Sequence, residues 1–376
     1  MKNILILVIL FTSGQYCKAQ VDDISPEVDS VFAFVKAHAP GYMIAAIKDD
    51  AFIFQKGYGL ANLEHNIPIS SKTNFNIASL SKQFTAAAIA ILILENKINL
   101  EDDVSTYLVD FPFARDSVKI KHLIYMTSGI NDYYYNPRES GADWSSLQFF
   151  NVDTAIQASY RSGELMYKPG SQWSYSNINY MLLTRVVEQV SGISFSEFVR
   201  KNIFLPLGMN DTYVNDDIFQ IIPNRALGYN HRDEENTSWL VESNYLKKAG
   251  EGFMQIHRNS PHYGGSGVYT TMEDFQKWLS NYHTKSFGGQ AFYDLMHKTM
   301  KFEHEKANDA FGLVLDKYED KEVVWYEGGD WGFSAFMIRF TASNTAIVCF
   351  SNLGTGHAKS KVWALYDILK AHSLID

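Results

Sequence analysis

The chain has 376 residues, 46% hydrophobic and 20% charged, a balance typical of a globular protein with one large domain or two smaller ones. A chain of this length buries enough apolar surface to fold without a metal or disulfide framework. Its formal charge of −9 argues against a nucleic-acid partner, which would favour a basic face. The net charge does not exclude a small anionic substrate, because one local cation can outweigh a distant net charge.

Residues 1–19 are typical of a secretory signal. Lys2 supplies the positive start, residues 4–11 the apolar run and Ala19 a small residue for cleavage. The run is too short to span a bilayer permanently; the alternative is a buried N-terminal strand. Cys17 raises the question of a lipid anchor, but the residues before it fit such a site poorly. We expect cleavage after Ala19, no stable membrane span afterwards, and a periplasmic or secreted protein.

The mature chain begins with a predicted helix over residues 26–39. Two β-like runs follow, at residues 43–47 and 52–55. Asp49 and Asp50 separate these runs, which predicts a β-hairpin.

The middle of the chain is predicted to be mainly helical. Residues 84–94 form one apolar helical run, and residues 181–190 form another that ends at Gly192. Ser194 followed by Glu197 is a capping-box start for the next helix.

The end of the chain mirrors its beginning. Residues 333–340 and 346–350 are β-rich runs around a turn, and residues 362–369 have helical spacing. Cys349 is the one cysteine left after signal cleavage, so no internal disulfide is expected. It lies in an apolar strand-like run, which favours a place in the core.

Strands and a helix at both ends of a long helical middle predict an α+β fold. We expect an antiparallel β-sheet flanked by the N- and C-terminal helices, with a large helical region inserted. Residues 20–376 would form one domain, with a sheet part at about 24–75 and 260–376 and a helical part at about 76–259. A ligand cleft is expected where the two parts meet.

The strongest chemical signal is Ser79-Leu80-Ser81-Lys82, where a polar loop becomes an apolar helix. If Ser79 opens that helix, the unpaired amides of the first turn can donate to an anion. That is half of an oxyanion hole. Residues i and i+3 share a helix face, so the Lys82 amine can lie against the Ser79 hydroxyl.

Lys82 can act as a base only when it is neutral. With a reference pKa of about 10.4, neutrality at pH 7 costs about 4.6 kcal/mol, which burial and a nearby proton acceptor must supply. The alternative is structural: Ser79 caps the helix and Lys82 is a solvated surface residue.

A second pattern follows a Pro-Gly pair: Tyr175-Ser176-Asn177. With Ser79 and Lys82 it makes the chain resemble the serine β-lactamase and penicillin-binding protein superfamily, especially its class C and esterase-like branch. Further stretches match that family in order, at residues 120–123 with 127–129, 206–209, 264–267 and 332–334. The resemblance spans about residues 30–370 and implies the β-lactamase/transpeptidase-like fold.

The resemblance implies a role for each motif residue. Ser79 would form an acyl-enzyme, and Tyr175 would relay its proton or protonate the leaving group. An ammonium at Lys82 would lower the pKa of Tyr175, so the two groups are treated as a coupled pair. Asn177 would hold Lys82 or a substrate carbonyl.

The third family motif departs from its usual form. Its Lys or His position, counted back from Phe333, falls on Tyr326. A phenol brings no positive charge, which weakens the case for β-lactam or D-Ala-D-Ala recognition. Gly328 and Gly329 would line the substrate site, with the Gly329 N–H as second oxyanion donor. The register leaves a second possibility, in which Glu327 is the aligned residue and its carboxylate enters the site.

Two other features carry less chemistry. Aromatic residues at 133–137 and 144–150 either line a wall of the cleft or form a packed surface loop. His257 and His262 lack the spacing of a helical metal pair, and His304 lies in a charged run expected to be solvated. We assign no metal and no cofactor.

The predicted function is an exported serine hydrolase that acts by an acyl-enzyme on a small-molecule or peptide substrate. Esterase, amidase and D-amino-acid peptidase activities fit this interpretation. One alternative is a binding or scaffolding homologue with reduced catalysis, for which Tyr326 is the reason. A narrower alternative is a β-lactamase.

Overall fold

The computed structural model describes residues 23–133, 151–161, 163–217, 219–232, 251–256, 262–301 and 308–375. The predicted signal at residues 1–19 lies outside the described residues. None of the helices in these ranges has both the length and the apolar composition needed to cross a membrane.

The secondary structure of the described residues alternates between short strands and helices of varied length. The α-helices are α1 (Ser25–Val31), α2 (Lys82–Leu94), α3 (Ile120–Ile124), α5 (Val152–Tyr160), α6 (Asn177–Ser191), α7 (Phe195–Val199), α9 (Met272–Thr284), α10 (Gly289–Met296) and α11 (Ala358–Ala371). The strands are β1 (Tyr42–Lys48), β2 (Ala51–Tyr58), β3 (Leu60–Asn62), β4 (Ile67–Pro68), β5 (Phe75–Asn76), β6 (Tyr213–Val214), β7 (Tyr229–His231), β8 (Phe253–Gln255), β9 (Val268–Thr270), β10 (Val314–Tyr318), β11 (Lys321–Asp330), β12 (Phe333–Phe340) and β13 (Thr345–Ser351). Tighter turns of 3₁₀ or π type occupy Ala78–Ser81, Val104–Thr106, Ala114–Asp116 and Arg200–Phe204.

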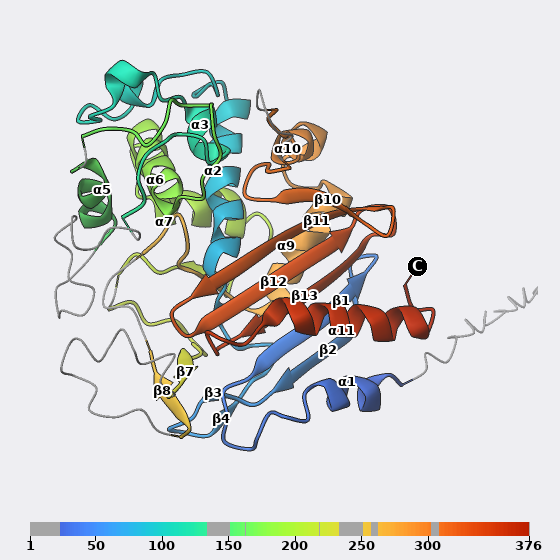
Figure 1. Cartoon of the computed structure of the whole chain (residues 1–376). Coiled ribbons are helices and arrows are strands. Elements are labelled where there is room, and N and C mark those ends of the chain that lie inside the picture. Colours follow the sequence, from blue (N-terminus) through green and yellow to red (C-terminus); the bar gives the residue numbers. More distant parts are fainter. Residues whose placement is uncertain are drawn as a thin grey trace, which may run out of the picture.

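One six-stranded sheet forms the frame of the molecule, in the order β10-β11-β12-β13-β1-β2 (Figure 1). All its neighbouring strands are antiparallel, and the N-terminal strand β1 pairs with the C-terminal strand β13, with Tyr42 opposite Ser351. Asp49 and Asp50 turn the β1–β2 hairpin with φ of 46° and 65°, as a two-residue hairpin turn of type I′ requires. The predicted sheet built from both ends of the chain is confirmed.

Helices cover both faces of this sheet (Figure 1). α1 and α11 lie on one face, where Ile44, Phe336 and Tyr366 belong to one buried cluster. The other face packs against α2 and α9, whose Phe84 and Phe275 belong to a larger buried cluster. Because both faces are covered, every residue of β12 and β13 is buried, and these strands are apolar almost throughout. The predicted α+β fold is therefore confirmed.

The N-terminal helix is shorter than its sequence predicts. A helix over residues 26–39 is wrong beyond Val31, where α1 ends. The Phe32 ring stacks on the Tyr58 ring at 4.1 Å and lies 5.3 Å from the Tyr42 ring. Burial of Phe32 against these strand residues outweighs the local preference for helix.

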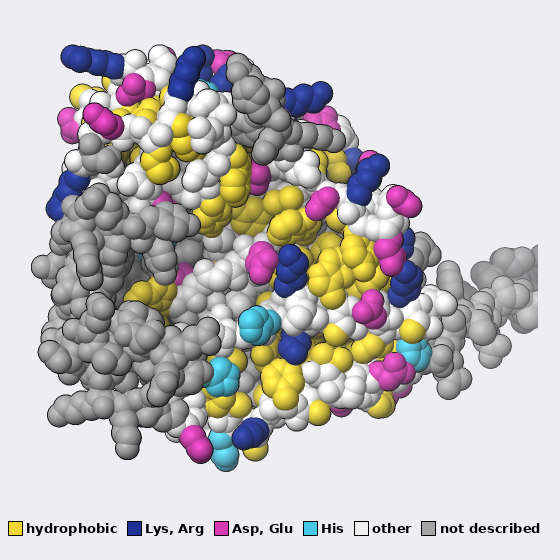
Figure 2. Space-filling view, in the orientation of Figure 1, with side chains coloured by type: hydrophobic (Ala, Val, Ile, Leu, Met, Phe, Trp, Pro, Cys, Tyr) yellow, Lys and Arg dark blue, Asp and Glu magenta, His cyan; other side chains and the backbone are white. Residues whose placement is uncertain are grey.

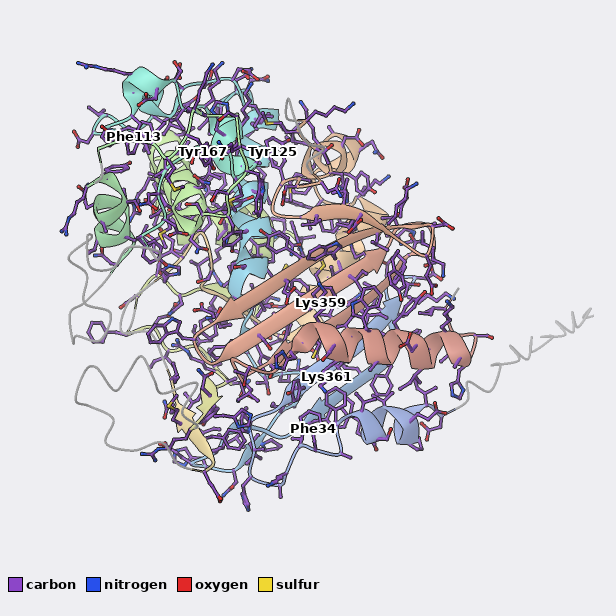
Figure 3. All side chains as sticks on the ribbon, in the orientation of Figure 1. Phe34, Phe113, Tyr125, Tyr167, Lys359 and Lys361 are labelled. Carbon is purple, nitrogen blue, oxygen red and sulfur yellow. The ribbon has the colours of Figure 1, made fainter. Side chains whose placement is uncertain are left out.

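α11 ties the N-terminal segment to the outer face of the sheet. Figure 2 shows hydrophobic side chains at this surface with lysine and acidic side chains between them. The Lys359 ammonium lies 4.9 Å from the centre of the Trp325 ring, and the Lys361 ammonium 4.3 Å from that of Phe34 (Figure 3). Cys349 lies beneath this helix as a buried free thiol, as predicted.

The helical region is organised around α2, which is buried at nearly every position and is therefore apolar on all sides. α6 packs against α2 and ends at Ser191, with Gly192 as its C-cap at φ of 75°. α7 begins after Ser194, whose side-chain oxygen accepts a hydrogen bond from the Glu197 N–H at 3.2 Å. Both predicted helix boundaries are confirmed.

Asn352 joins segments that are far apart in the sequence. It is fully buried, and its Oδ1 accepts a hydrogen bond from the Gly41 N–H at 2.7 Å. Its Nδ2 donates to the carbonyl oxygens of Leu60 and Leu227, each at 3.0 Å. The amide therefore satisfies backbone groups on three different segments.

We predict that Asn352→Leu lowers the free energy of unfolding by about 3 kcal/mol or more, because each buried backbone group left unpaired costs about 1–3 kcal/mol. Urea unfolding of the full chain measures the change. Asn202→Leu is the control, since Asn202 donates a single bond, to the Phe198 carbonyl, and should cost about 1 kcal/mol or less. Equal losses in the two variants would contradict the role given to Asn352.

Candidate active site

Ser79 lies in the 3₁₀ turn Ala78–Ser81, between β5 and α2. The expectation that Ser79 opens the α-helix is wrong by one turn, since α2 begins at Lys82. The chain must change direction sharply on leaving β5, and Ala78 takes a left-handed conformation with φ of 50°, which non-glycine residues rarely adopt. The Asn76 side chain holds this turn by accepting a bond from the Ala78 N–H at 2.9 Å. The Ser79 side chain remains partly reachable, because the residue is 9% exposed.

The Lys82 amine is fully buried and faces oxygen acceptors on three of the described residues. Its Nζ lies 3.2 Å from the Ser79 Oγ, 2.9 Å from the Asn177 Oδ1 and 2.6 Å from the Gly265 carbonyl oxygen. An ammonium could donate to all three oxygens. A neutral amine could donate to the two carbonyl oxygens and direct its lone pair at the Ser79 hydroxyl. The same geometry therefore suits the amine before and after it accepts a proton.

The Tyr175 hydroxyl lies 2.7 Å from the Ser79 Oγ, and either oxygen can be the donor. Burial raises the pKa of Tyr175; the bond from Ser79 lowers it, and the charges of Asp132 and Asp330 raise it further. The pKa of Tyr175 is therefore raised overall, against the expected lowering, because burial is the largest effect. The contribution of a Lys82 ammonium to this pKa stays a prediction. Tyr175 is a neutral phenol that can donate its proton.

Asn177 is held by a residue that the sequence did not single out. The backbone N–H of Asn177 donates to the Asp132 Oδ2 at 2.7 Å, and its Nδ2 lies 3.2 Å from the same oxygen. These bonds fix the side-chain amide so that its oxygen faces Lys82. Asp132 is 3% exposed and 45 residues away in sequence, and nothing in the pattern around it pointed to Asn177.

The strand β11 brings the third motif to the site. Tyr326 is 8% exposed and belongs to the buried cluster on the inner face of the sheet. The next side chain, Glu327, faces the other way and forms an ion pair with Lys359 of α11 at 3.6 Å. The possible register in which Glu327 enters the site is therefore wrong, because alternate residues of a strand face opposite sides.

The glycines after Glu327 lie in different surroundings. A Cβ on Gly328 would lie 2.8 Å from the Ser79 nitrogen and 2.9 Å from the Ile77 carbonyl oxygen. A Cβ on Gly329 would meet nothing within 4 Å. β11 therefore approaches the Ser79 turn closely at residue 328 and borders open space at residue 329.

Tyr326 and Asp309 set the charge on this side of the site. The pKa of Tyr326 is raised by burial, with smaller contributions from Tyr175, Tyr180 and the Asp309 carboxylate. Burial also raises the pKa of Asp309 to about 6, against a hydrogen bond from Trp173 that lowers it. The family resemblance implies Lys or His at this position. Tyr326 instead places a neutral phenol there, and the Asp309 carboxylate helps to raise its pKa.

A cavity of about 280 Å³ lies beside the Ser79 turn and includes Asn76 and Asp330 in its lining. The Asn76 Nδ2 donates to the Asp330 Oδ2 at 3.1 Å. Arg225 also lines the cavity and donates to the Tyr269 hydroxyl at 2.9 Å. The cavity offers both an acidic and a basic side chain to a bound molecule.

His262 lies in the wall of this cavity as a buried neutral residue. Its Nδ1 lies 2.8 Å from the Ser266 Oγ, and its Nε2 contacts the Tyr133 hydroxyl. Burial lowers the pKa of His262 to about 4. Tyr133 is itself buried, while the rest of the predicted aromatic stretch, residues 134–150, lies outside the described residues.

In the ranges that the structure describes, no three His, Cys, Asp or Glu side chains gather closely enough to hold a metal.

Comparisons of sequence place this chain among known proteins. The profile of the Beta-lactamase family matches residues 24–372. Penicillin-binding protein 4* of Bacillus subtilis (strain 168) is 28% identical over 326 residues, which cover 83% of this chain and 68% of that protein. Protein flp of Staphylococcus aureus (strain MRSA252) is 25% identical over 348 residues, which cover 91% of this chain and 65% of that protein. The chain spans about two thirds of the length of these relatives.

A comparison of structures gives the same fold. The D-amino acid amidase from Ochrobactrum anthropi SV3, solved with L-phenylalanine amide, matches with a TM-score of 0.76 and 22% identity. The match covers 93% of this chain and 100% of that chain. At this level of identity, the likeness shows a shared fold.

The close approach at Gly328 gives a prediction that needs no substrate. Gly328→Ala should lower the melting temperature by about 4 °C or more, because a Cβ 2.8 Å from the Ser79 nitrogen must displace backbone atoms. Gly329→Ala, which meets open space, should leave the melting temperature within about 2 °C. Thermal unfolding followed by circular dichroism compares the two. Similar shifts would mean that β11 does not press on the Ser79 turn.

Proposed function

The chain belongs to the Beta-lactamase family, and from this premise we propose that it is an exported serine hydrolase that attacks an ester or amide bond with Ser79. The observation that carries the proposal is the position of the Ser79 Oγ between two proton-transfer groups. The Lys82 Nζ lies 3.2 Å from it and the Tyr175 hydroxyl 2.7 Å from it. Both distances allow hydrogen bonds, which a general base and a general acid require.

Acylation begins when neutral Lys82 takes the Ser79 proton as Oγ bonds to the substrate carbonyl carbon. The carbonyl oxygen becomes an oxyanion. When the bond to the leaving group breaks, Tyr175 gives its proton to the departing oxygen or nitrogen and regains one from the Lys82 ammonium. Water then releases the acyl group by the reverse use of the same groups, which returns Ser79 to its hydroxyl form. The raised pKa of Tyr175 supports a donor role for the phenol at neutral pH.

The backbone N–H groups of Ser79 and Gly329 are the donors that we assign to the oxyanion. Residue 328 approaches the Ser79 nitrogen so closely that only glycine fits there. This approach brings the following peptide of β11 to the nucleophile. Donors fixed in this way stabilise developing charge without having to reorganise during the reaction.

The substrate class follows from the charge of the site. Tyr326 supplies no cation for a substrate carboxylate, and the Asp309 carboxylate acts on Tyr326 as a negative charge. For the part of the substrate that faces Tyr326 we infer an uncharged group or an amine, as in a neutral ester or amide, an amino-acid amide or a short peptide. The D-amino acid amidase that shares this fold makes D-amino-acid amides a rational first choice for assay. No nucleic-acid partner is expected.

Two alternative functions are each supported by one observation. The neutral phenol at Tyr326 would suit a binding protein that has lost turnover. Membership of the Beta-lactamase family supports β-lactamase activity as the second alternative. Export rests on the signal predicted at residues 1–19, and the mature protein would be periplasmic or secreted.

A fluorophosphonate probe tests the nucleophile. We predict that the wild-type protein is labelled and that Ser79→Ala is not. Lys82→Ala and Tyr175→Phe should each slow labelling or substrate acylation by about 100-fold or more, as expected for acid–base partners. A labelling rate close to wild type in either variant would remove that residue from the mechanism.

Substrate turnover and probe labelling of the wild-type protein distinguish the hydrolase from the two alternative functions. Turnover of nitrophenyl esters or D-phenylalanine anilide with no turnover of a chromogenic cephalosporin would support the hydrolase over the β-lactamase. A folded wild-type protein that resists the probe would support the binding homologue.

Substitution at Tyr326 tests the substrate class. Tyr326→His should raise kcat/KM for an ester with a free carboxylate, relative to its neutral analogue, by about tenfold, since a charge-assisted hydrogen bond becomes possible. Tyr326→Phe, which removes only the hydroxyl, should leave that ratio unchanged. A ratio that stays constant or falls in Tyr326→His would mean that residue 326 does not contact the acyl side of the substrate.

A further inference from the structure

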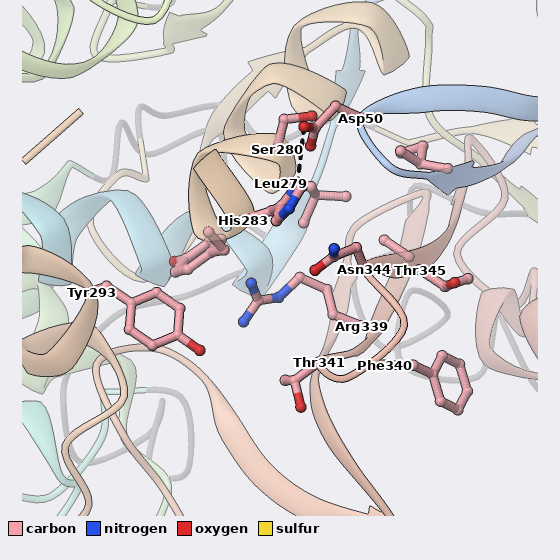
Figure 4. A pocket seen from close by; sticks show the side chains of 13 residues that line it. Asp50, Leu279, Ser280, His283, Tyr293, Arg339, Phe340, Thr341, Asn344 and Thr345 are labelled. Carbon is pink, nitrogen blue, oxygen red and sulfur yellow. Dashed lines mark hydrogen bonds and ion pairs between the residues drawn. The ribbon is translucent and has the colours of Figure 1, made fainter. Parts of the chain in front are cut away.

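A second, smaller cavity lies between α9, α10 and the end of the sheet (Figure 4). Its volume is about 50 Å³. Tyr282 and His283 of α9, Tyr293 of α10 and Arg339 of β12 line it. Figure 4 shows the Arg339 side chain reaching from its strand into the space between Tyr293 and His283.

Arg339 is the unusual residue of this cavity. It is 8% exposed, and its guanidinium lies 3.9 Å from the centre of the Tyr282 ring. Its Nη2 donates to the His297 Nε2 at 2.7 Å, while its Nε–H is buried without a hydrogen-bond partner. Within the described ranges, no carboxylate forms an ion pair with this guanidinium. A buried cation without an anionic partner is rare, because burying an unpaired charge is costly.

The groups around Arg339 do not neutralise it. The His297 Nδ1 lies 2.8 Å from the Tyr293 carbonyl oxygen, which fixes the hydrogen on Nδ1 and leaves Nε2 as an acceptor. Burial lowers the pKa of His297 to about 4, so it is neutral at physiological pH. The carboxylate of Asp50 also lines the cavity, but it lies 3.0 Å from the His283 Nδ1.

We propose that this cavity is a binding site for a small oxyanion, the carboxylate or phosphate group of a ligand, held by Arg339. A planar guanidinium presents parallel N–H groups that match two oxygens of such a group. The volume corresponds to about four water molecules, which is room for one anionic group and not for a whole nucleotide or peptide. The ligand would supply the anionic partner that Arg339 does not have among the described residues.

The site is separate from the Ser79 centre and does not depend on the proposed hydrolase function. Arg339 lies opposite Val324 on β11. Val324 precedes Gly328, which touches the Ser79 turn, by about 13 Å along the strand. A ligand here would bridge α9, α10 and the sheet and would stabilise their packing.

Titration of the full mature chain with sodium phosphate and with sodium acetate tests the proposal. Sodium chloride at matched ionic strength is the reference for non-specific salt effects. We expect a saturable rise in melting temperature with at least one oxyanion, and saturable heat in calorimetry, because a ligand that binds only the folded state stabilises it. A response to phosphate alone would identify a phosphate group as the ligand chemistry, and a response to acetate a carboxylate. Responses no larger than that of chloride would overturn the proposal.

Variants locate the site. Arg339→Met should weaken anion binding by about tenfold or more, the loss expected for charge-assisted bonds. Asp50→Asn should tighten it by about threefold or more, because it removes a negative charge from the lining. Arg185→Met is the control, since Arg185 pairs with Asp153 and Glu188 outside this cavity, and it should keep wild-type binding.

Two results would contradict the placement of the anion. One is unchanged affinity in a folded Arg339→Met protein. The other is unchanged or weaker affinity in Asp50→Asn, which decides the question even if Arg339→Met does not fold.

Discussion

The site depends on one constraint: a lysine amine that is buried away from solvent needs a hydrogen-bond acceptor for each of its N–H groups. Lys82 meets it with the Ser79 Oγ, the Asn177 Oδ1 and the Gly265 carbonyl oxygen. These partners come from the 3₁₀ turn, from the first turn of α6 and from the loop before β9. The amine therefore joins three segments that are far apart in the sequence, at the point where the chemistry is expected. A buried amine that is fully hydrogen-bonded can also change its protonation state without leaving an orphaned group.

The surrounding structure keeps those partners in place. Asp132 fixes the Asn177 amide, and the Asn76 side chain holds the left-handed turn at Ala78 that carries Ser79. β11 closes the other side through Gly328. Each is a rigid backbone or buried side-chain contact, and such contacts position reacting groups more narrowly than exposed loops do. Glu327 is kept out of the centre by the alternation of the strand and by its pair with Lys359.

Local patterns in the sequence predicted most of the fold and the four motif side chains. The hairpin at Asp49 and Asp50, the end of α6 at Gly192 and the meeting of Ser79, Lys82, Tyr175 and Asn177 all follow from short spacings or from family motifs. The misses come from tertiary contacts. Helix α1 stops early because Phe32 packs on Tyr58, and Asp132 was overlooked because its partner is 45 residues away. The pKa of Tyr175 was expected to be lowered, but burial, which spacing cannot measure, raises it.

The pairing of β1 with β13 has a consequence for how the chain reaches its folded state. Gly41 and Ser351, which share a hydrogen bond beside this pair, are 310 residues apart. An isolated two-stranded hairpin is only marginally stable. We therefore expect the β1–β2 hairpin to become stable only when β13 pairs with β1. Contacts of such long range form slowly. The sheet is therefore completed only when nearly the whole chain is available, because the edge of β1 that β13 covers has no partner strand until the last strands are made.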